Sequence, residues 1–254
     1  MRLAALALAL CVIGQPALAA CRLALALALD ISGSVDADEY RLQMSGLSTA
    51  LADRDVVAAL LASPDAPVAI AIYEWSSARY QNVIQDWTLI DSAASLEGVR
   101  ARLNQIQRAP APQATGLGAA MEFGGRLLDD APGCWNRTLD ISGDGKNNDW
   151  PDPRNVRAEG SLAGVLINGL VIAPDTGRGD RATTEAGELV AYFQARVIQG
   201  PDAFVEVAFG YEDYADAMRR KLLRELRSRP VGIGPRPPVR DVWRVGLARP
   251  IRPQ

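Results

Sequence analysis

Residues 23–34 read LALALALDISGS, and this stretch decides the fold. Its first part, from Leu23 to Asp30, is apolar throughout and ends in an acid. A short apolar run followed by polar turn residues is typical of a central strand of a parallel sheet, buried on both faces. The sequence therefore predicts a buried parallel strand near the start of the chain, with a polar loop directly at its carboxyl end.

Apolar runs and helical periodicities alternate after this strand. We expect further strands over 68–75, 80–87, 138–142, 165–173 and 203–208, and helices over 36–61, 91–106, 115–128, 154–163, 183–194 and 211–229. The link 76–79 is short enough only for a hairpin, so the strands that it joins form an antiparallel pair. The alternation predicts an α/β fold, a doubly wound and mainly parallel sheet with one antiparallel edge strand and helices on both faces.

The two ends of the chain differ in kind from its middle. Residues 1–20 contain Arg2, an apolar stretch and the triplet Ala17-Leu18-Ala19, which is the pattern of a secretory signal peptide. The apolar stretch is shorter than the roughly 20 residues of a membrane helix, and no later run reaches that length. We expect residues 21–229 to form one domain and residues 230–254 to form a Pro/Arg-rich tail, either a solvated extension or a basic partner-binding segment. The protein is predicted to be exported, either periplasmic or secreted.

Cleavage of the signal peptide leaves two cysteines, Cys21 and Cys134. Two cysteines in an exported protein are typical of one disulfide bond, and the alternative is two unrelated buried thiols. The stretch Leu18-Ala19-Ala20-Cys21 also fits the lipobox of bacterial lipoproteins, in which the cysteine carries a lipid anchor. The strand that begins at Leu23 leaves no flexible tether for such an anchor, which makes it the minority alternative.

The composition excludes several classes of function. The 254 residues include no histidine, which rules out Ser-His-Asp and Cys-His catalysis and imidazole-bound zinc. The 27 basic and 30 acidic residues give a net charge of −3, whereas nucleic-acid binding needs a basic surface. Neither GxGxxG nor GxxxxGK[ST] follows the first strand, which argues against a nucleotide-binding fold.

Polar residues follow the strands where open α/β sheets bind their ligands, beyond the carboxyl ends. Asp30, Ser32 and Ser34 follow the first strand, Thr115 begins the glycine-rich helix, and Asp144 follows the strand over 138–142. Two carboxylates and three hydroxyls are an all-oxygen set that suits a hard cation, Mg²⁺ first, with Mn²⁺ or Ca²⁺ as alternatives. Neutral hydroxyl ligands leave the cation with positive charge, so it would attract a carboxylate of a partner.

This set of residues resembles the metal-ion-dependent adhesion site of von Willebrand factor A-type (vWA) domains. That family has DxSxS after the first strand, a threonine in the second loop and an aspartate after the fourth strand, and all five positions are filled here. The stretches LDISGDGKNN, INGLVI and FVEVAFGYEDYADAMRRKLLREL are similar to a bacterial group of exported vWA proteins of uncharacterised function. The resemblance covers roughly residues 23–226.

The resemblance implies roles for the five residues. Ser32, Ser34 and Thr115 would contact the cation directly, and Asp30 and Asp144 would act through bound water. Each hydroxyl residue taken singly is also an ordinary cap of a helix or turn. The residues Asn147, Asn148 and Asp149, which follow the site, either shape its loop or form a plain polar turn, and the second interpretation is favoured. Glu74 and Trp75 lie at the rim or in the core.

The resemblance also implies a pairing of the cysteines, because the first and fourth strands of vWA sheets are parallel neighbours. Cys21 lies nine residues before Asp30, and Cys134 lies ten residues before Asp144. The two cysteines would then lie level with each other at the opposite end of these strands. Strands about 4.8 Å apart allow a disulfide, so a Cys21–Cys134 bond is feasible and would leave no thiol to acylate.

Three functions from different classes compete. The favoured one is a non-enzymatic binding module that captures an acidic residue of a protein partner through the cation. The second is a metal-dependent hydrolase or phosphotransferase that uses Asp30, although such phosphotransferases usually carry a second carboxylate where this chain has Ser32. The third is a structural vWA domain with a vestigial site.

Overall fold

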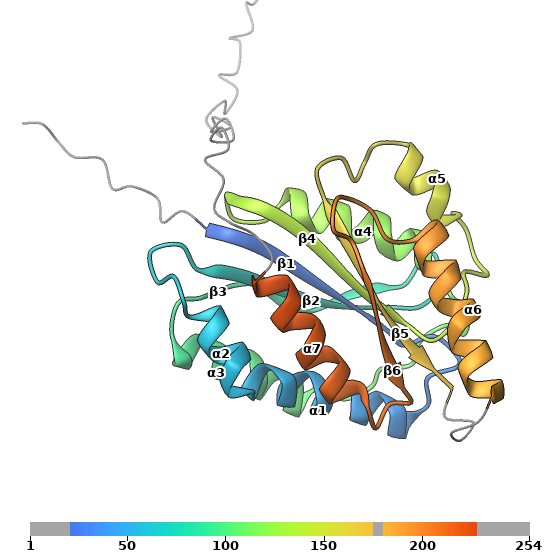
Figure 1. Cartoon of the computed structure of the whole chain (residues 1–254), viewed down its shortest axis with the longest axis horizontal. Helices are drawn as coiled ribbons and strands as arrows, with labels where there is room; N and C mark the ends of the chain where they lie inside the picture. The colour runs from blue at the N-terminus through green and yellow to red at the C-terminus, as the bar shows by residue number, and fades with distance from the viewer. Residues whose placement is uncertain (1–20, 175–179, 228–254) are drawn as a thin grey trace, which may run out of the picture.

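Six strands form one sheet in the order β3-β2-β1-β4-β5-β6 (Figure 1). They are β1 (Cys21–Asp30), β2 (Val68–Trp75), β3 (Gln81–Ile90), β4 (Cys134–Gly143), β5 (Leu166–Ala173) and β6 (Val205–Phe209). Only β3 is antiparallel to its neighbour, and the other adjacent pairs are parallel. The carboxyl ends of the five parallel strands therefore share one edge of the sheet, called the carboxyl edge below. The predicted fold class is confirmed.

The structure is a computed structural model that describes residues 21–174 and 180–227. The predicted signal peptide, residues 1–20, and the Pro/Arg-rich tail, residues 230–254, lie outside the described residues. The described helices are α1 (Ala37–Ala52), α2 (Arg54–Leu60), α3 (Ala93–Gln105), α4 (Leu117–Asp129), α5 (Pro153–Ala158), α6 (Asp180–Arg196) and α7 (Tyr214–Arg227). None of the described helices is long and apolar enough to cross a membrane.

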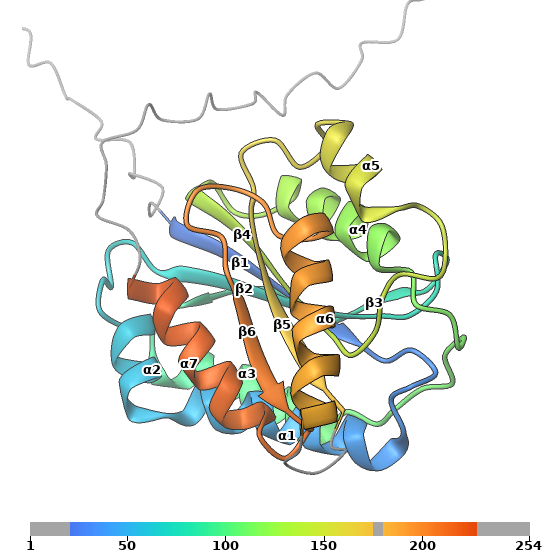
Figure 2. The same ribbon diagram turned by 45° about the vertical axis from the view of Figure 1, so that its right-hand side comes forward.

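The strict alternation of leucine and alanine in β1 sorts the two faces of the sheet. Its leucines belong to the core that α1, α2, α3 and α7 cover, and its alanines belong to the core beneath α4, α5 and α6. Figure 2 shows these two helical layers on opposite faces. Small alanines let α4 approach closely, and a Cβ at Gly124 would lie only 2.7 Å from Leu139 and from the Tyr73 hydroxyl.

Some predicted boundaries are wrong for identifiable reasons. The helix predicted over 36–61 is two helices, because Asp53 ends α1 and its carboxylate caps the first turn of α2. Strand β4 begins at Cys134 rather than 138, because the polar stretch 134–137 pairs with β1 without an apolar pattern. The helix predicted over 154–163 ends at Ala158, shortly before Gly160, whose φ of 77° is left-handed.

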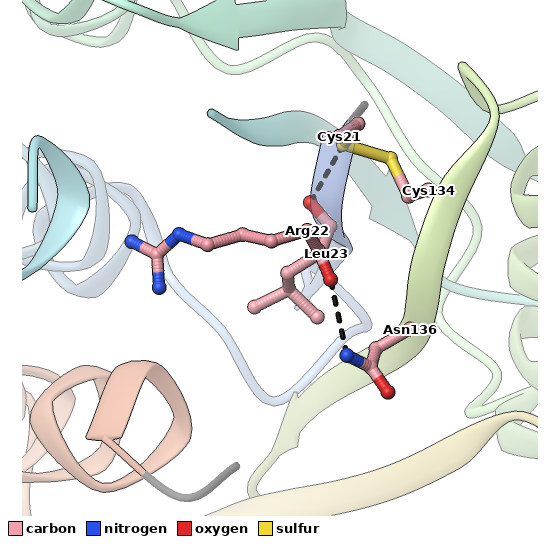
Figure 3. The surroundings of a disulfide bond; sticks show 5 residues. All are labelled: Cys21, Arg22, Leu23, Cys134 and Asn136. Atoms are coloured by element: carbon pink, nitrogen blue, oxygen red, sulfur yellow. Dashed lines mark hydrogen bonds between the residues drawn. A yellow bond between two sulfur atoms is a disulfide. The ribbon is translucent and has the colours of Figure 1, made fainter. Parts of the chain in front are cut away.

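The predicted disulfide between Cys21 and Cys134 is present (Figure 3). The two residues are direct partners in the parallel register of β1 and β4, and their Cα atoms are 4.2 Å apart. Next to the bond, the Asn136 amide donates a hydrogen bond of 3.1 Å to the carbonyl of Arg22. The bond lies at the end of the sheet opposite the carboxyl edge, and it leaves no Sγ of Cys21 for acylation.

A buried ionic cluster joins α7 to the sheet. Lys221 on α7 places its Nζ 2.6 Å from Asp140 Oδ1 on β4 and 2.7 Å from Glu225 Oε1. The Asn168 amide on β5 donates a further hydrogen bond of 2.7 Å to Glu225. All four residues are buried, so two carboxylates share one ammonium away from water. Burial is the main cause that raises the pKa of Asp140 to about 7, and the positive charge of Lys221 offsets part of this rise.

Removal of the disulfide should destabilise the protein. The bond spans 113 residues, and closing so long a loop restricts the unfolded chain. We expect the Cys21→Ser/Cys134→Ser double variant to lose about 2–4 kcal/mol of unfolding free energy in urea denaturation. The wild type in reducing agent should match the variant. Two titratable thiols in the untreated wild type would contradict the bond.

The Asp140 carboxyl should make stability depend on pH. Its pKa is raised in the folded state, so between about pH 4 and about pH 7 the folded protein holds a proton that the unfolded chain has released. The unfolding free energy should therefore fall as the pH rises through this window. Asp140→Asn removes the titrating group and should show a shallower fall in urea denaturation at a series of pH values. An equally steep fall in the variant would rule this contribution out.

Candidate metal centre

The five predicted residues meet at the carboxyl edge. Asp30 is the last residue of β1, and Asp144 directly follows β4, the parallel neighbour of β1. The Ser34 hydroxyl donates a hydrogen bond of 2.7 Å to Asp144 Oδ1. The hydroxyls of Ser32 and Ser34 are 3.3 Å apart, and Thr115 Oγ1 donates to Ser32 Oγ at 3.4 Å. The structure thus brings together side chains from three separate loops.

Asp30 is the most deeply buried acid of this group, with none of its surface exposed. Its Oδ1 accepts a hydrogen bond of 2.8 Å from the Ser32 amide, whereas its Oδ2 has no hydrogen-bond partner among the described residues. Burial, and then the negative charge of Asp144, raise the pKa of Asp30 to about 8. A buried carboxylate oxygen without a partner is costly, and a cation or its bound water at this point would remove the cost.

Glycine 143 leaves room for this carboxylate. A Cβ at position 143 would lie 3.1 Å from Asp30 Oδ2 and 3.4 Å from the indole of Trp75. Trp75 is completely buried, so it belongs to the core rather than to the rim. Glu74 is also buried, and its carboxylate accepts a hydrogen bond of 2.5 Å from the Tyr40 hydroxyl.

The loop that carries Ser32 and Ser34 is held from both sides. The hydrogen bond from the Ser32 amide to Asp30 Oδ1 closes a tight local turn. The guanidinium of Arg108 donates to the carbonyls of Ile31 at 3.2 Å and Val35 at 2.9 Å. The chain of Gln113 packs so closely against the loop that a Cβ at position 33 would lie 2.7 Å from the Gln113 Cβ.

The residues after Asp144 do more than form a plain polar turn. Asn148 Oδ1 accepts a hydrogen bond of 2.7 Å from the backbone N–H of Thr115, and the backbone N–H of Asn148 donates one of 3.0 Å to the Thr115 carbonyl. Asn147 Oδ1 accepts from the Gly118 amide at 3.2 Å, and Asp149 Oδ2 accepts from the Ala78 amide at 2.8 Å. This loop therefore fixes the backbone of Thr115, and only its run of Asn and Asp side chains could have indicated the role.

Tyr211 is a site residue that the sequence did not reveal. It lies in the turn before α7, and its hydroxyl donates a hydrogen bond of 3.4 Å to Asp144 Oδ2. Burial raises the pKa of Asp144, and the hydrogen bonds from Ser34 and Tyr211 offset part of that rise. No spacing in the sequence links positions 144 and 211, because the contact exists only when β6 and α7 return to the sheet.

The donor chemistry fits a hard divalent cation. The centre offers two carboxylates and three hydroxyls, and all of these donors are oxygens. In the part of the chain that the structure describes, no three or more His, Cys, Asp or Glu residues cluster as metal ligands. A cation here would therefore depend on the hydroxyls and on water as well as on the two acids.

Substitution of Asn148 tests the role of the loop. Asn148→Ala leaves the buried Thr115 amide without its acceptor, so we expect the unfolding free energy to fall by about 1–2 kcal/mol. Asn148→Asp keeps the acceptor oxygen and is the matched control, with a smaller loss. Urea denaturation of both variants measures the difference. Equal stability of Asn148→Ala and the wild type would show that this hydrogen bond does not support the site.

Comparisons with solved structures identify the fold. Proximal thread matrix protein 1 of the mussel byssus matches with a TM-score of 0.56 at 11% identity, over 82% of this chain and 48% of that chain. Another structure of that protein is described as having a zinc-occupied MIDAS (metal-ion-dependent adhesion site) motif. It matches with a TM-score of 0.52 at 13% identity, over 82% of this chain and 46% of that chain. A von Willebrand factor type A protein from Catenulispora acidiphila matches with a TM-score of 0.53 at 14% identity, over 82% of this chain and 43% of that chain. This chain thus spans about half the length of these proteins.

An aerotolerance-related membrane protein from Bacteroides fragilis matches with a TM-score of 0.51 at 13% identity, over 79% of this chain and 98% of that chain. Identities this low show a shared fold and nothing more. No curated protein matches the sequence. The family model described as "Protein of unknown function (DUF1194)" matches residues 20–230. The chain therefore belongs to this family, and its fold is that of vWA domains.

Proposed function

We propose that this protein is an exported module that binds a protein partner through a divalent cation, Mg²⁺ in the first place. Asp30, Ser32, Ser34, Thr115 and Asp144 would hold the cation at the carboxyl edge. The observation that carries the proposal is the convergence of these five oxygen side chains around a buried Asp30 oxygen that has no hydrogen-bond partner among the described residues.

The charges at the centre define what it would bind. Asp30 and Asp144 repel each other, and a divalent cation would supply the positive charge that offsets this repulsion. Ser32, Ser34 and Thr115 are neutral, so two formal negative charges at most come from the chain. In the vWA-type arrangement the two acids act through water, which leaves positive charge facing outward. An acidic side chain of a partner is the complementary ligand.

The burial of Asp30 favours binding over catalysis. A nucleophilic carboxylate must be reachable by substrate, whereas Asp30 has no exposed surface. Such burial suits a group that is held in place beneath a cation. The structure described with a zinc-occupied MIDAS motif supports the use of a divalent cation on this fold, although zinc is not the metal that we propose here.

Two features support export. Residues 1–20 have the pattern of a signal peptide, and the Cys21–Cys134 bond is of the kind that forms in oxidising compartments. The bond also argues against a lipid anchor at Cys21, because it occupies the Sγ atom that such an anchor would need. We infer a periplasmic or secreted location from these two features together.

Metal titration by calorimetry tests the function. After treatment with a chelator, the purified protein should bind Mg²⁺ or Mn²⁺ in a saturable manner, and the Asp30→Ala/Ser32→Ala double variant should not. Ser34→Ala removes one hydroxyl from an exposed position and should weaken binding by about tenfold or more, which corresponds to the loss of one ligand. Titrations with Ca²⁺ and Zn²⁺ determine the preference among metals.

Ser45→Ala is the matched control, because Ser45 is an exposed serine on α1 whose hydroxyl bonds to the Leu42 carbonyl. It should bind the metal as the wild type does. Circular dichroism should show that all variants are folded. A wild type that binds none of the four cations, or a double variant that binds as well as the wild type, would contradict the proposed centre.

A further inference from the structure

Two aromatic side chains are more exposed than the other large hydrophobic side chains among the described residues. Trp150 is 70% exposed and Phe209 is 57% exposed, whereas the other exposed large hydrophobic side chains among the described residues range from 37% to 45%. A single exposed apolar residue is ordinary, so exposure alone carries little weight. A binding role is supported instead by where these two residues lie relative to the candidate metal centre.

Trp150 is connected to the centre through its own loop. It lies two residues after Asn148, which exchanges two hydrogen bonds with the backbone of Thr115. The Asp149 carboxylate accepts two hydrogen bonds of 2.8 Å, one from the backbone N–H of Trp150 at Oδ1 and one from the backbone N–H of Ala78 at Oδ2. Ala78 lies in the hairpin between β2 and β3, so the backbone at Trp150 is fixed on the β2 side of the site.

Phe209 is connected to the centre from the opposite side. It is the last residue of β6, and its amide donates a hydrogen bond of 3.1 Å to Asp213 Oδ2. Two residues later, the Tyr211 hydroxyl contacts Asp144. In the sheet order, β6 lies two strands beyond β4 in the direction away from β2 (Figure 1). The two aromatic residues therefore lie on either side of the metal residues at the carboxyl edge.

We propose that Trp150 and Phe209, with the metal residues between them, form the docking surface for a protein segment that carries one acidic residue flanked by apolar side chains. This inference rests on the proposed function, since the acidic residue is the one that the cation binds. The flanking apolar side chains pack on the two aromatic rings and exclude water from the charged contact.

The spacing suits an extended peptide. The end of β6 is two strand spacings from β4, which is about 10 Å. An extended chain advances about 3.3 Å per residue. An apolar side chain two or three residues from the acid would therefore reach Phe209 at the end of β6. Because the backbone of both aromatic residues is already hydrogen bonded, little ordering would be needed on binding, and exposed tryptophan in a fixed position is typical of interface hot spots.

A protein segment accounts for the surface better than a neutral glycan does. Sugars also stack on aromatic rings, but a neutral sugar does not provide the negative charge that hydroxyl-bound metal attracts. A peptide carboxylate with apolar neighbours provides both contacts in one short segment.

Three acetylated and amidated heptapeptides test the proposal in saturating Mg²⁺, with binding measured by fluorescence anisotropy of a dye-labelled peptide. They are GFGDGFG, GGGDGGG and GFGNGFG. We expect GFGDGFG to bind at least about tenfold more tightly than GGGDGGG and GFGNGFG to show no binding. Trp150→Ser and Phe209→Ser should each abolish most of this tenfold gain while leaving the affinity for Mg²⁺ itself unchanged.

Trp135→Ser is the matched control. Trp135 is an exposed tryptophan, 45% accessible, next to Cys134 at the opposite end of β4, and its substitution should leave the gain intact. Equal binding of the two aspartate peptides, or an equal loss in Trp135→Ser, would overturn the docking surface but not the proposed function. Failure of both aspartate peptides to bind the metal-loaded protein would count against carboxylate capture itself. If maltoheptaose binds more tightly than GFGDGFG and Trp150→Ser abolishes that binding, the surface would be reassigned to glycans.

Discussion

β1 and β4 lie side by side and parallel in the centre of the sheet, with Cys21 opposite Cys134 at one end and the two acids Asp30 and Asp144 at the other. This register places the two carboxylates at the same level of the carboxyl edge, since neighbouring strands are about 4.8 Å apart. A slip of one residue would turn the leucines of β1 toward the face that its alanines occupy. The leucine–alanine alternation and the disulfide therefore protect the same register on which the candidate centre depends.

Two groups of acids near β4 differ in how their charge is balanced. Asp140 faces Lys221, so the chain itself supplies the cation, and the result is a structural link between the sheet and α7. Asp30 lies on the neighbouring strand and repels Asp144, and its Oδ2 has no partner among the described residues. In the first group the Lys221 ammonium lies between two carboxylates, whereas among the described residues no basic side chain forms an ion pair with Asp30 or Asp144. This difference is the physical reason for proposing a metal at one and not at the other.

The loops at the carboxyl edge connect the centre to its surroundings. Asn147, Asn148 and Asp149 tie the loop after β4 to the start of α4 and to the β2–β3 hairpin, and Tyr211 ties Asp144 to the turn before α7. Trp150 directly follows Asp149, and Phe209 lies two residues before Tyr211, so the two aromatic residues lie on either side of the candidate site. The candidate metal residues and the proposed partner contacts are thus parts of one hydrogen-bonded arrangement, in which neighbouring aromatic contacts would add specificity to the cation site.

The order of strands and helices, the buried first strand, the hairpin and the five candidate metal-site residues were readable from the sequence, because apolar periodicity and the DxSxS spacing are local patterns. The Cys21–Cys134 pairing followed once the resemblance placed the first and fourth strands side by side. The break of the first helix at Asp53 was missed because its flanks continue the apolar pattern. Only the tertiary structure decided that Asn148 supports Thr115, that Tyr211 reaches Asp144 and that Lys221 is buried against Asp140. Each of these contacts joins residues 33 or more positions apart, and such contacts arise from the packing of whole elements, which no local spacing records.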